Sequence, residues 1–324
     1  MVGSSLSVNK LGLKVAQKLI EYHKECNVKV VSGPLGSTII DAGIETKGGI
    51  DAGILVAEAT MGGLGRVKVG FRDYDGLALP TVIVYTDHPV IACMASQYAG
   101  WRIKTKDYFA MGSGPARALA LKPKKLFQEI GYKDEHDEAL IVLEAGKYPT
   151  EEAIKLIAEK CGVKPQNVTV IITPTQSIAG SVQISARIVE TGIHKLHTVG
   201  FHLDKFIAGQ GEAPIAPPHP DPTVAMGRTN DMILYGGVAT YFVNAEDSEI
   251  VEYLKKAPSC TSRDYGKPFY EAFKEAGFDF YKIDPNLFAP AMYVVFNVKT
   301  GSTFKAGYIN TEVLKRSIAF QEVK

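Results

Sequence analysis

Cysteine is sparse in this sequence, and the few cysteines lie far apart. The chain of 324 residues has four, at positions 26, 93, 161 and 260, and it has no Cys-x-x-Cys pair. Because structural zinc sites are commonly built from such pairs, we expect no structural zinc. Reduced thiols packed in a core are the expected state of the four cysteines.

The chain also lacks an excess of charge and a long apolar run. Its 36 basic and 35 acidic residues give a net charge of +1, which argues against a dedicated nucleic-acid-binding protein. No apolar run reaches the roughly 18 residues that a membrane helix needs. Residues 1–10 lack the basic-then-apolar order of a signal peptide. We therefore expect a cytoplasmic protein that binds neither nucleic acid nor membranes.

Phosphate-binding and nucleophile motifs are absent from the glycine-rich segments. Residues 109–118 contain no P-loop or G-x-G-x-x-G spacing and no G-x-S-x-G around Ser113. We expect a loop here, followed by a helix with Pro115 in its first turn. The free N–H groups of that helix start, with Arg117 beside them, would suit an anion. A tight turn with an arginine nearby is the alternative.

What the chain does contain is apolar residues in strand and helix patterns. Hydrophobic residues make up 46% of it. A β-α-β unit is predicted at residues 139–143, 150–160 and 168–172, and a hairpin at residues 292–308. Residues 50–58 fit a strand or a helix equally well.

These patterns predict an α+β (mixed α/β) fold. We expect a two-domain subunit with mixed sheets flanked by helices and a cleft between the domains. The predicted domains are residues 1–121 and 122–324, because residues 122–138 read as a charged connector. A return of the C-terminal part of the chain to the first domain stays open.

Residues 173–197 hold the most informative pattern, a turn followed by a predicted helix. At about 100° per residue, Arg187, Glu190, His194 and His197 fall within roughly 80° of one another, opposite an apolar face. Gly192 costs roughly 1 kcal/mol relative to alanine here, which indicates the close approach of a ligand or another backbone. The alternative is an exposed Arg–Glu pair, worth about 0.2–0.5 kcal/mol.

Two later segments also carry candidate site residues. Residues 207–222 are dense in proline and glycine and are predicted to be an ordered loop over a cleft. Residues 224–240 are predicted to be a largely apolar helix, whose Arg228, Asn230 and Asp231 need partners in a pocket or at a subunit contact. Separately, histidines at positions 194, 197 and 202 could bind a metal, but no HExxH motif supports this.

Several stretches, taken in order, resemble the methenyltetrahydromethanopterin cyclohydrolase family. Each stretch is short, but together they span nearly the whole chain. They are residues 7–9, 40–44, 48–49, 52–53, 61–65, 110–117, 180–197, 217–222 and 227–231. The resemblance implies reversible hydrolysis of the methenyl bridge of 5,10-methenyltetrahydromethanopterin to the N5-formyl form, in one-carbon metabolism or methanogenesis. It also implies a cytosolic homotrimer of two-domain subunits, with the pterin between the domains and no prosthetic group or metal.

The same resemblance assigns the catalytic roles. Arg187 and Glu190 match the family's catalytic pair, and Glu190 is expected to move a proton from water to the departing nitrogen, N10. We add eight candidate substrate contacts: Gly112, Ser113, Gly114, Arg117, Gln183, His194, Arg228 and Asn230. Two other functions stay open, namely a non-catalytic pterin-binding or formyl-relay subunit and a histidine-ligated metal hydrolase.

Overall fold

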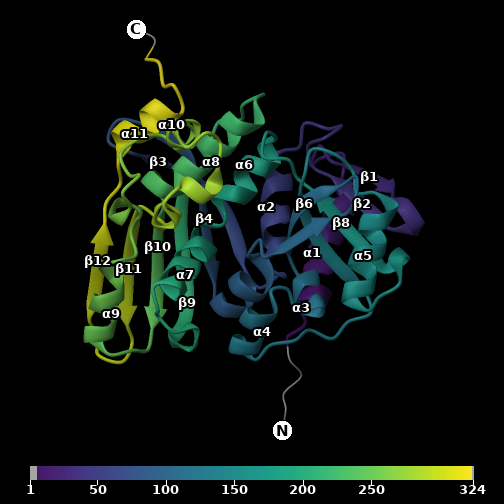
Figure 1. The fold of residues 1–324 in the computed structure, drawn as a ribbon, viewed down its shortest axis with the longest axis horizontal. Coiled ribbons are helices and arrows are strands. Elements are labelled where there is room, and N and C mark those ends of the chain that lie inside the picture. The colour runs from purple at the N-terminus through teal and green to yellow at the C-terminus, as the bar shows by residue number, and fades with distance from the viewer. Residues whose placement is uncertain (1–5, 323–324) are drawn as a thin grey trace. The chain divides into compact units, whose positions relative to one another are not determined.

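Two six-stranded mixed sheets organise the chain, as a computed structural model shows for residues 6–322 (Figure 1). One sheet belongs to unit 1, which takes the chain up to Arg66 together with Val90–Gln183. The other belongs to unit 2, which contains Val67–Pro89 and the chain from Ile184 onward. The predicted α+β fold with mixed sheets is confirmed. The first five residues considered for a signal peptide lie outside the described part, in which no helix is long and apolar enough to cross a membrane.

Unit 1 is built on a sheet with the strand order β1-β2-β8-β7-β6-β5. Its strands are β1 (Lys29–Ser32), β2 (Thr38–Asp41), β5 (Trp101–Lys104), β6 (Phe109–Ser113), β7 (Ala139–Glu144) and β8 (Val168–Ile172). Its helices are α1 (Val8–Glu21), α2 (Ile50–Thr60), the π-helix η2 (Val90–Gln97), α3 (Ala116–Ala120), α4 (Lys124–Ile130) and α5 (Glu151–Cys161). The central strands β2, β8 and β7 run parallel, and the outer pairs are antiparallel.

The central strand β7 shows why the sheet of unit 1 needs helices on both faces. Leu140 and Val142 pack in the cluster with α1 and α2, whereas Ile141 and Leu143 pack with α5 on the other face. A parallel strand buried on both sides reads as a continuous apolar run, which is what the sequence shows here. The predicted β-α-β unit is confirmed, including the cap of α5, where the hydroxyl of Thr150 accepts from the N–H of Ala153.

Unit 2 is built on a sheet with the strand order β12-β11-β10-β9-β4-β3. Its strands are β3 (Arg66–Asp73), β4 (Ala78–Thr86), β9 (Phe206–Pro214), β10 (Val238–Val243), β11 (Met292–Asn297) and β12 (Thr303–Gly307). Its helices are α7 (Ile188–Thr198), α8 (Pro222–Gly236), α9 (Asp247–Leu254), α10 (Phe269–Glu275) and α11 (Thr311–Ser317); α6 (Ile178–Ser185) runs from unit 1 into unit 2. The predicted hairpin near the C-terminus is the antiparallel pair β11 and β12.

The boundaries of the units differ from the predicted division at residues 121 and 122. Strands β6 and β7 are hydrogen-bonded neighbours in one sheet, so that division falls inside unit 1. The predicted connector contains α4, whose Phe127 is buried in a core cluster of unit 1. Strands β3 and β4, which come early in the chain, join the sheet of unit 2 instead. Pairing between segments this far apart in sequence leaves no trace in local composition.

The structure also decides the form of three local segments. Residues 50–60 form helix α2, one of the two structures that the pattern allowed. The segment at 207–222, predicted as a loop, begins with strand β9, whose Gly209 and Gly211 lie under the side chains of α7. The helix predicted at 224–240 ends at Gly236, and β10 starts two residues later. In each case packing against a distant element decides between structures that the local pattern allows.

Candidate active site

The helix predicted over residues 173–197 is broken in two. α6 ends at Ser185, and α7 starts after a turn at Ala186 and Arg187. Arg187 has φ −80° and ψ 2°, which are not helical values. At the end of α6 the hydroxyl of Ser185 donates to the carbonyl of Pro214 on β9 at 2.7 Å. The break places Glu190 in the first turn of α7, where free N–H groups favour a negative charge.

Arg187 and Glu190 form a poorly accessible ion pair. Nη1 of Arg187 lies 3.9 Å from Oε2 of Glu190, and the side chains are 13% and 8% exposed. This low exposure contradicts the alternative of a solvated pair on a helix surface. At 3.9 Å the guanidinium acts on the carboxylate electrostatically and not through a direct hydrogen bond between these two atoms. In water-poor surroundings that attraction is stronger than at a surface.

The opposite face of α7 holds the helix on the sheet of unit 2, where Figure 1 shows it beside β9 and β10. Four apolar residues pack there, as predicted: Ile188, Val189, Ile193 and Leu196. Near the other end of the helix, Nζ of the buried Lys195 donates to Oδ1 of Asn286 at 2.6 Å. Burial lowers the pKa of Lys195, and the charge of Asp284 acts against that shift. α7 is thus attached at both of its ends.

His194 carries a neutral imidazole at physiological pH. Burial lowers its pKa to about 4, and the charges of His197 and Lys195 add to the effect. Its backbone carbonyl accepts from the hydroxyl of Thr198. A neutral imidazole has one donor and one acceptor, so it can orient a polar ligand without adding charge.

Arg117 is bound within the interior of unit 1. Its side chain is fully buried, and Nε donates to the carbonyl of Lys122 at 2.9 Å. Nη1 donates to the carbonyls of Met94 and Ser96 at 3.0 and 3.1 Å. Two aromatic rings also flank the guanidinium. The geometry supports the alternative to an anion contact for Nε and Nη1, because protein carbonyls within unit 1 accept from both of these atoms.

The segment around Gly112, Ser113 and Gly114 is mostly strand, so the predicted loop was wrong. Gly112 and Ser113 end β6, and Gly114, at φ +93°, turns the chain toward α3. The N–H of Gly114 donates to the carbonyl of Ser96 at 2.8 Å. A Cβ on Gly112 would lie 3.0 Å from the carbonyl oxygen of Trp101. These glycines serve packing within unit 1, and their contact with a substrate stays a prediction.

Two of the polar residues on α8 are engaged inside unit 2. The carboxylate of the fully buried Asp231 accepts from the N–H of Phe269 and from the hydroxyl of Ser317. Nδ2 of Asn230 donates to the carbonyl of Met226, one turn earlier, at 2.9 Å. Asp231 therefore joins α8 to α10 and α11, which answers the need for a partner that the sequence raised.

Two other predicted contacts have buried polar atoms without partners. Nε of Arg228 in unit 2 is buried and has no hydrogen-bond partner among residues 6–322. The same holds, within that part of the chain, for Oε1 of Gln183, a residue of unit 1 that is 1% exposed. Because an unpaired buried polar group is costly, such atoms are candidates for ligand contacts.

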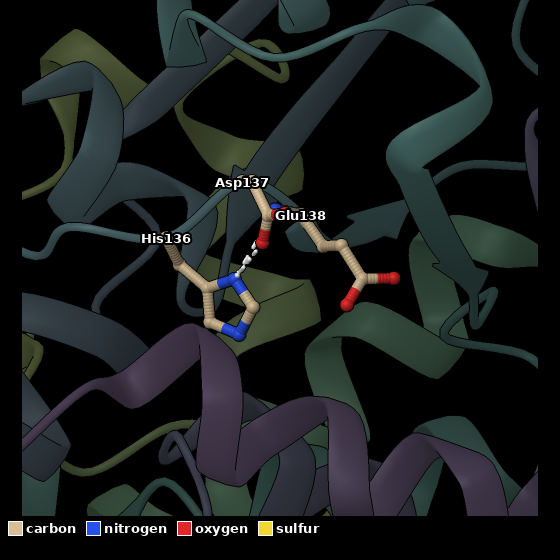
Figure 2. A group of neighbouring side chains, drawn as sticks. All are labelled: His136, Asp137 and Glu138. Atoms are coloured by element: carbon tan, nitrogen blue, oxygen red, sulfur yellow. Dashed lines mark hydrogen bonds and ion pairs between the residues drawn. The ribbon is translucent and has the colours of Figure 1, made fainter.

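The metal-ligating side chains that come together in the described part of the chain are not the predicted histidines. They are the consecutive residues His136, Asp137 and Glu138, just before β7 in unit 1. In Figure 2 Nδ1 of His136 faces Asp137, and the Glu138 carboxylate lies to the side of the ring. Nδ1 lies 2.8 Å from Oδ1 of Asp137, and one ligand atom of each of the three residues lies within 4.8 Å of the others. The two acidic residues are exposed, as loop carboxylates commonly are. We assign no metal site to them.

Tyr241, Asn286 and Pro214 contact α6 or α7, and the sequence did not identify them. Each contact joins segments between 29 and 91 residues apart. The one local signal was Gly192, where a Cβ would lie 2.1 Å from the hydroxyl oxygen of Tyr241. The close approach indicated by that glycine is therefore real, and the approaching group is a side chain of the protein.

Comparison with known proteins identifies the family to which this arrangement belongs. The family described as "Cyclohydrolase (MCH)" matches residues 7–318. The chain belongs to this family. A relative from Methanococcoides burtonii, named methenyltetrahydromethanopterin cyclohydrolase, is 50% identical over 98% of this chain and 100% of its own. Relatives of the same name from Methanocaldococcus jannaschii and Methylobacillus flagellatus are 46% and 45% identical, over 98% and 97% of this chain and 100% and 96% of theirs.

Membership of the cyclohydrolase family confirms the resemblance seen in the sequence. It makes the protein an enzyme, so the alternative of a non-catalytic carrier is not supported. Family membership does not assign roles to single residues. The roles depend on the geometry described above.

Proposed function

We propose that this cyclohydrolase hydrolyses the methenyl bridge of 5,10-methenyltetrahydromethanopterin to give the N5-formyl form. The names of its relatives supply the substrate. Within the protein, the observation that carries the proposal is the poorly accessible ion pair at 3.9 Å between Arg187, in the turn before α7, and Glu190, in the first turn of α7. In this proposal Glu190 carries the proton and Arg187 orients the carboxylate.

The chemistry of the substrate sets what the site must do. The methenyl carbon shares a positive charge with N5 and N10, so it is electrophilic before it meets the enzyme. A water molecule attacks this carbon while Glu190 takes one of its protons, and the same proton then goes to N10 as the bond from carbon to N10 breaks. The water oxygen becomes the formyl oxygen. The second water proton is released to solvent, which balances the lost positive charge.

Arg187 orients the Glu190 carboxylate through its positive charge. A carboxylate that can rotate freely would spend little time facing the attacking water, and alignment of the reactants supplies a large part of enzymatic acceleration. A fixed cation 3.9 Å away restrains Glu190. His194 is neutral because its pKa is lowered to about 4, mainly by burial. It therefore adds no repulsion toward a cationic substrate.

For substrate binding we favour Arg228 and Gln183. The buried Nε of Arg228 has no partner among the described residues, and a guanidinium suits the acidic tail of the pterin. Oε1 of Gln183, likewise without a partner within residues 6–322, would accept from a pterin N–H. Asn230, Gly112, Ser113 and Gly114 are weaker candidates, because their polar or backbone groups are engaged elsewhere.

The test of the catalytic proposal is Glu190→Gln, which keeps the shape of the side chain and removes its basicity. In single-turnover experiments the methenyl pterin is followed by its ultraviolet absorbance. We expect the chemical step to slow by about two orders of magnitude or more while substrate still binds. Glu252→Gln, an exposed residue on α9, is the control and should turn over normally. A near-normal rate in Glu190→Gln would remove this residue from the mechanism.

We also propose that the chain forms a homotrimer through the outer face of the unit 2 sheet. Tyr241 points toward α7, so its neighbours Thr240 and Phe242 point to the opposite face. The rings of Phe242 and Phe296 pair there at 5.1 Å. Half-buried or exposed apolar residues of this face include Ile83, Val238, Phe242, Met292, Val294 and Phe296, with Glu212 between Ile83 and Val238. Exposed apolar side chains gathered in this way are typical of a protein contact.

Light scattering during gel filtration tests the homotrimer. We expect a mass three times that of the 35.1 kDa chain, and smaller species for Phe242→Asp. An unchanged assembly in Phe242→Asp would exclude this face as the contact. The cytoplasmic location and the lack of a prosthetic group stay predictions.

A further inference from the structure

Helix α7 lies unusually close to the sheet of unit 2, and glycines make this possible. A Cβ on Gly211 would come within 2.7 Å of Cγ2 of Ile188, and one on Gly209 within 2.8 Å of Cγ1 of Val189. A Cβ on Gly237 would lie 2.6 Å from Cδ1 of Ile188. Side chains at these positions would push the first turn of α7 away from the strands. That turn is the one that carries Glu190.

A hydrogen bond from the sheet holds the first turn of α7 in place. The hydroxyl of Tyr241, on β10, donates to the carbonyl of Val189 at 2.7 Å. Val189 immediately precedes Glu190. The Tyr241 ring is fully buried and meets the ring of Phe206 edge-on at 5.2 Å, so the hydroxyl has little freedom to move. The position of the hydroxyl is therefore transmitted to the backbone beside the proposed proton carrier.

Gly192 is the counterpart of this hydroxyl on the helix. A Cβ at position 192 would lie 2.1 Å from the Tyr241 oxygen and 3.1 Å from the Cβ of Ala239. Glycine inside a helix is unfavourable relative to alanine, and a buried hydroxyl is unfavourable without a partner. Alanine at position 192 would suit the helix better, but its methyl group would collide with the Tyr241 hydroxyl. Glycine at position 192 therefore leaves the space in which that hydroxyl reaches the carbonyl of Val189.

From this fit we propose that Tyr241 is a positioning residue of the cyclohydrolase, with Gly192 as the space that admits its hydroxyl. This inference rests on the proposed role of Glu190. Tyr241 acts through the backbone of Val189 and sets where the Glu190 carboxylate lies. Its removal therefore changes the rate of the chemical step more than the affinity for substrate, because small displacements of a reacting group slow a reaction strongly.

The first test is Tyr241→Phe, which removes one oxygen and keeps the packing. We expect kcat to fall about tenfold with KM changed less than about twofold. Tyr293→Phe is the matched control. Tyr293 is fully buried on the neighbouring strand β11, and its hydroxyl has no partner among the described residues. That variant should keep its kcat, and an equal loss in both variants would overturn the proposal.

The second test uses the steric relation between the two residues. Gly192→Ala should lower kcat further than Tyr241→Phe does, since the new methyl group displaces the helix. Combining Gly192→Ala with Tyr241→Phe removes the oxygen at 2.1 Å and leaves two carbon atoms at 3.1 Å, Cζ of residue 241 and Cβ of Ala239. We expect the kcat of the double variant to rise above that of Gly192→Ala, toward that of Tyr241→Phe. Independent, multiplying losses would contradict the fit. If Gly192→Ala alone does not fold, recovery of folding in the double variant gives the same answer.

The third test separates this proposal from the function on which it rests. If Tyr241 acts through Glu190, Tyr241→Phe should cause no further loss in single-turnover rate when Glu190 is already Gln. A tenfold loss in both backgrounds overturns the positioning role and leaves the role of Glu190 intact. A normal rate in Glu190→Gln alone removes Glu190 from the mechanism, and with it the premise on which the role of Tyr241 rests.

Discussion

Asp231 is a fully buried acid, and we predict that its ionisation destabilises unit 2. Burial raises the pKa of the carboxyl to about 7 from an ordinary value of 3.8. Hydrogen bonds from Ser317 and Phe269, at 2.6 and 2.8 Å, act against that rise, and the charge of Glu271 adds to it. The free-energy cost of removing the carboxylate from water is larger than the stabilisation that the two hydrogen bonds give to its charged form.

The sign of the effect follows from the two pKa values. The folded state binds the proton more tightly than the unfolded state does. The stabilising contribution is therefore complete below pH 3.8 and is lost as the pH rises through 7. Between pH 5 and pH 8 this amounts to roughly 2–3 kcal/mol of the free energy of unfolding. Because the side chain is fully buried, screening by solvent does not reduce this figure much.

Asp231→Asn is the perturbation that isolates this contribution. The remaining oxygen still accepts from the N–H of Phe269, and the new amide donates to the oxygen of Ser317. Urea unfolding followed by circular dichroism, at one protein concentration, gives the free energy of unfolding of both proteins at each pH. We expect the variant to gain roughly 2–3 kcal/mol relative to the natural protein between pH 5 and pH 8. A difference that stays constant over this range would refute the reasoning.

Two further variants test other buried or hydrogen-bonded charges. Hydrogen bonds lower the pKa of Asp247 in the folded protein, the largest effect coming from Thr300 and smaller ones from Asn297 and Ser302. The contribution of Asp247 to the free energy of unfolding is therefore present above pH 3.8 and is lost as the pH falls through the pKa of the folded state. Asp247→Asn should therefore be less stable at pH 7, with a difference in urea midpoint that shrinks in acid; a constant difference would contradict this. Arg117→Lys should lose about 2–4 kcal/mol, because an ammonium cannot reproduce the three hydrogen bonds to carbonyls. Urea unfolding followed by Trp101 fluorescence, in the same unit, measures it, and a loss below about 0.5 kcal/mol would show that these bonds matter little.

The sequence predicted those parts of the fold that depend on short-range patterns. Strand β8 and helix α5 were located closely, because alternation, helical periodicity and a threonine cap lie within a few residues. The membership of β3 and β4 in the sheet of unit 2 was not predicted. Strand β4 pairs with β9, and Tyr85 faces Gln210 across 125 positions of the chain. No local pattern specifies which distant strand will supply such a partner.

The same distinction holds for the site. Arg187 and Glu190 are three residues apart, so their meeting could be predicted from spacing alone. For Arg117 the sequence left two alternatives open, because an arginine beside glycines looks the same whether it faces a ligand or protein carbonyls; in the structure Nε and Nη1 donate to carbonyls. The break after Ser185 was missed because Ala186 and Arg187 are good helix formers. The contacts of that region with β9 override the propensity, and they involve residues almost 30 positions away.

The break between α6 and α7 bears directly on the proposed chemistry. In one continuous helix the backbone N–H groups near Glu190 would all donate to carbonyls of the preceding turn. Arg187 would then be the one positive group beside the carboxylate. In the first turn of α7 it also faces the positive end of the helix. Both positive groups hold the carboxylate in place electrostatically. A carboxylate is a sufficient base here, since water becomes acidic as its oxygen bonds to a cationic carbon, and the proton is needed again at N10. One carboxylate can therefore serve both halves of the reaction.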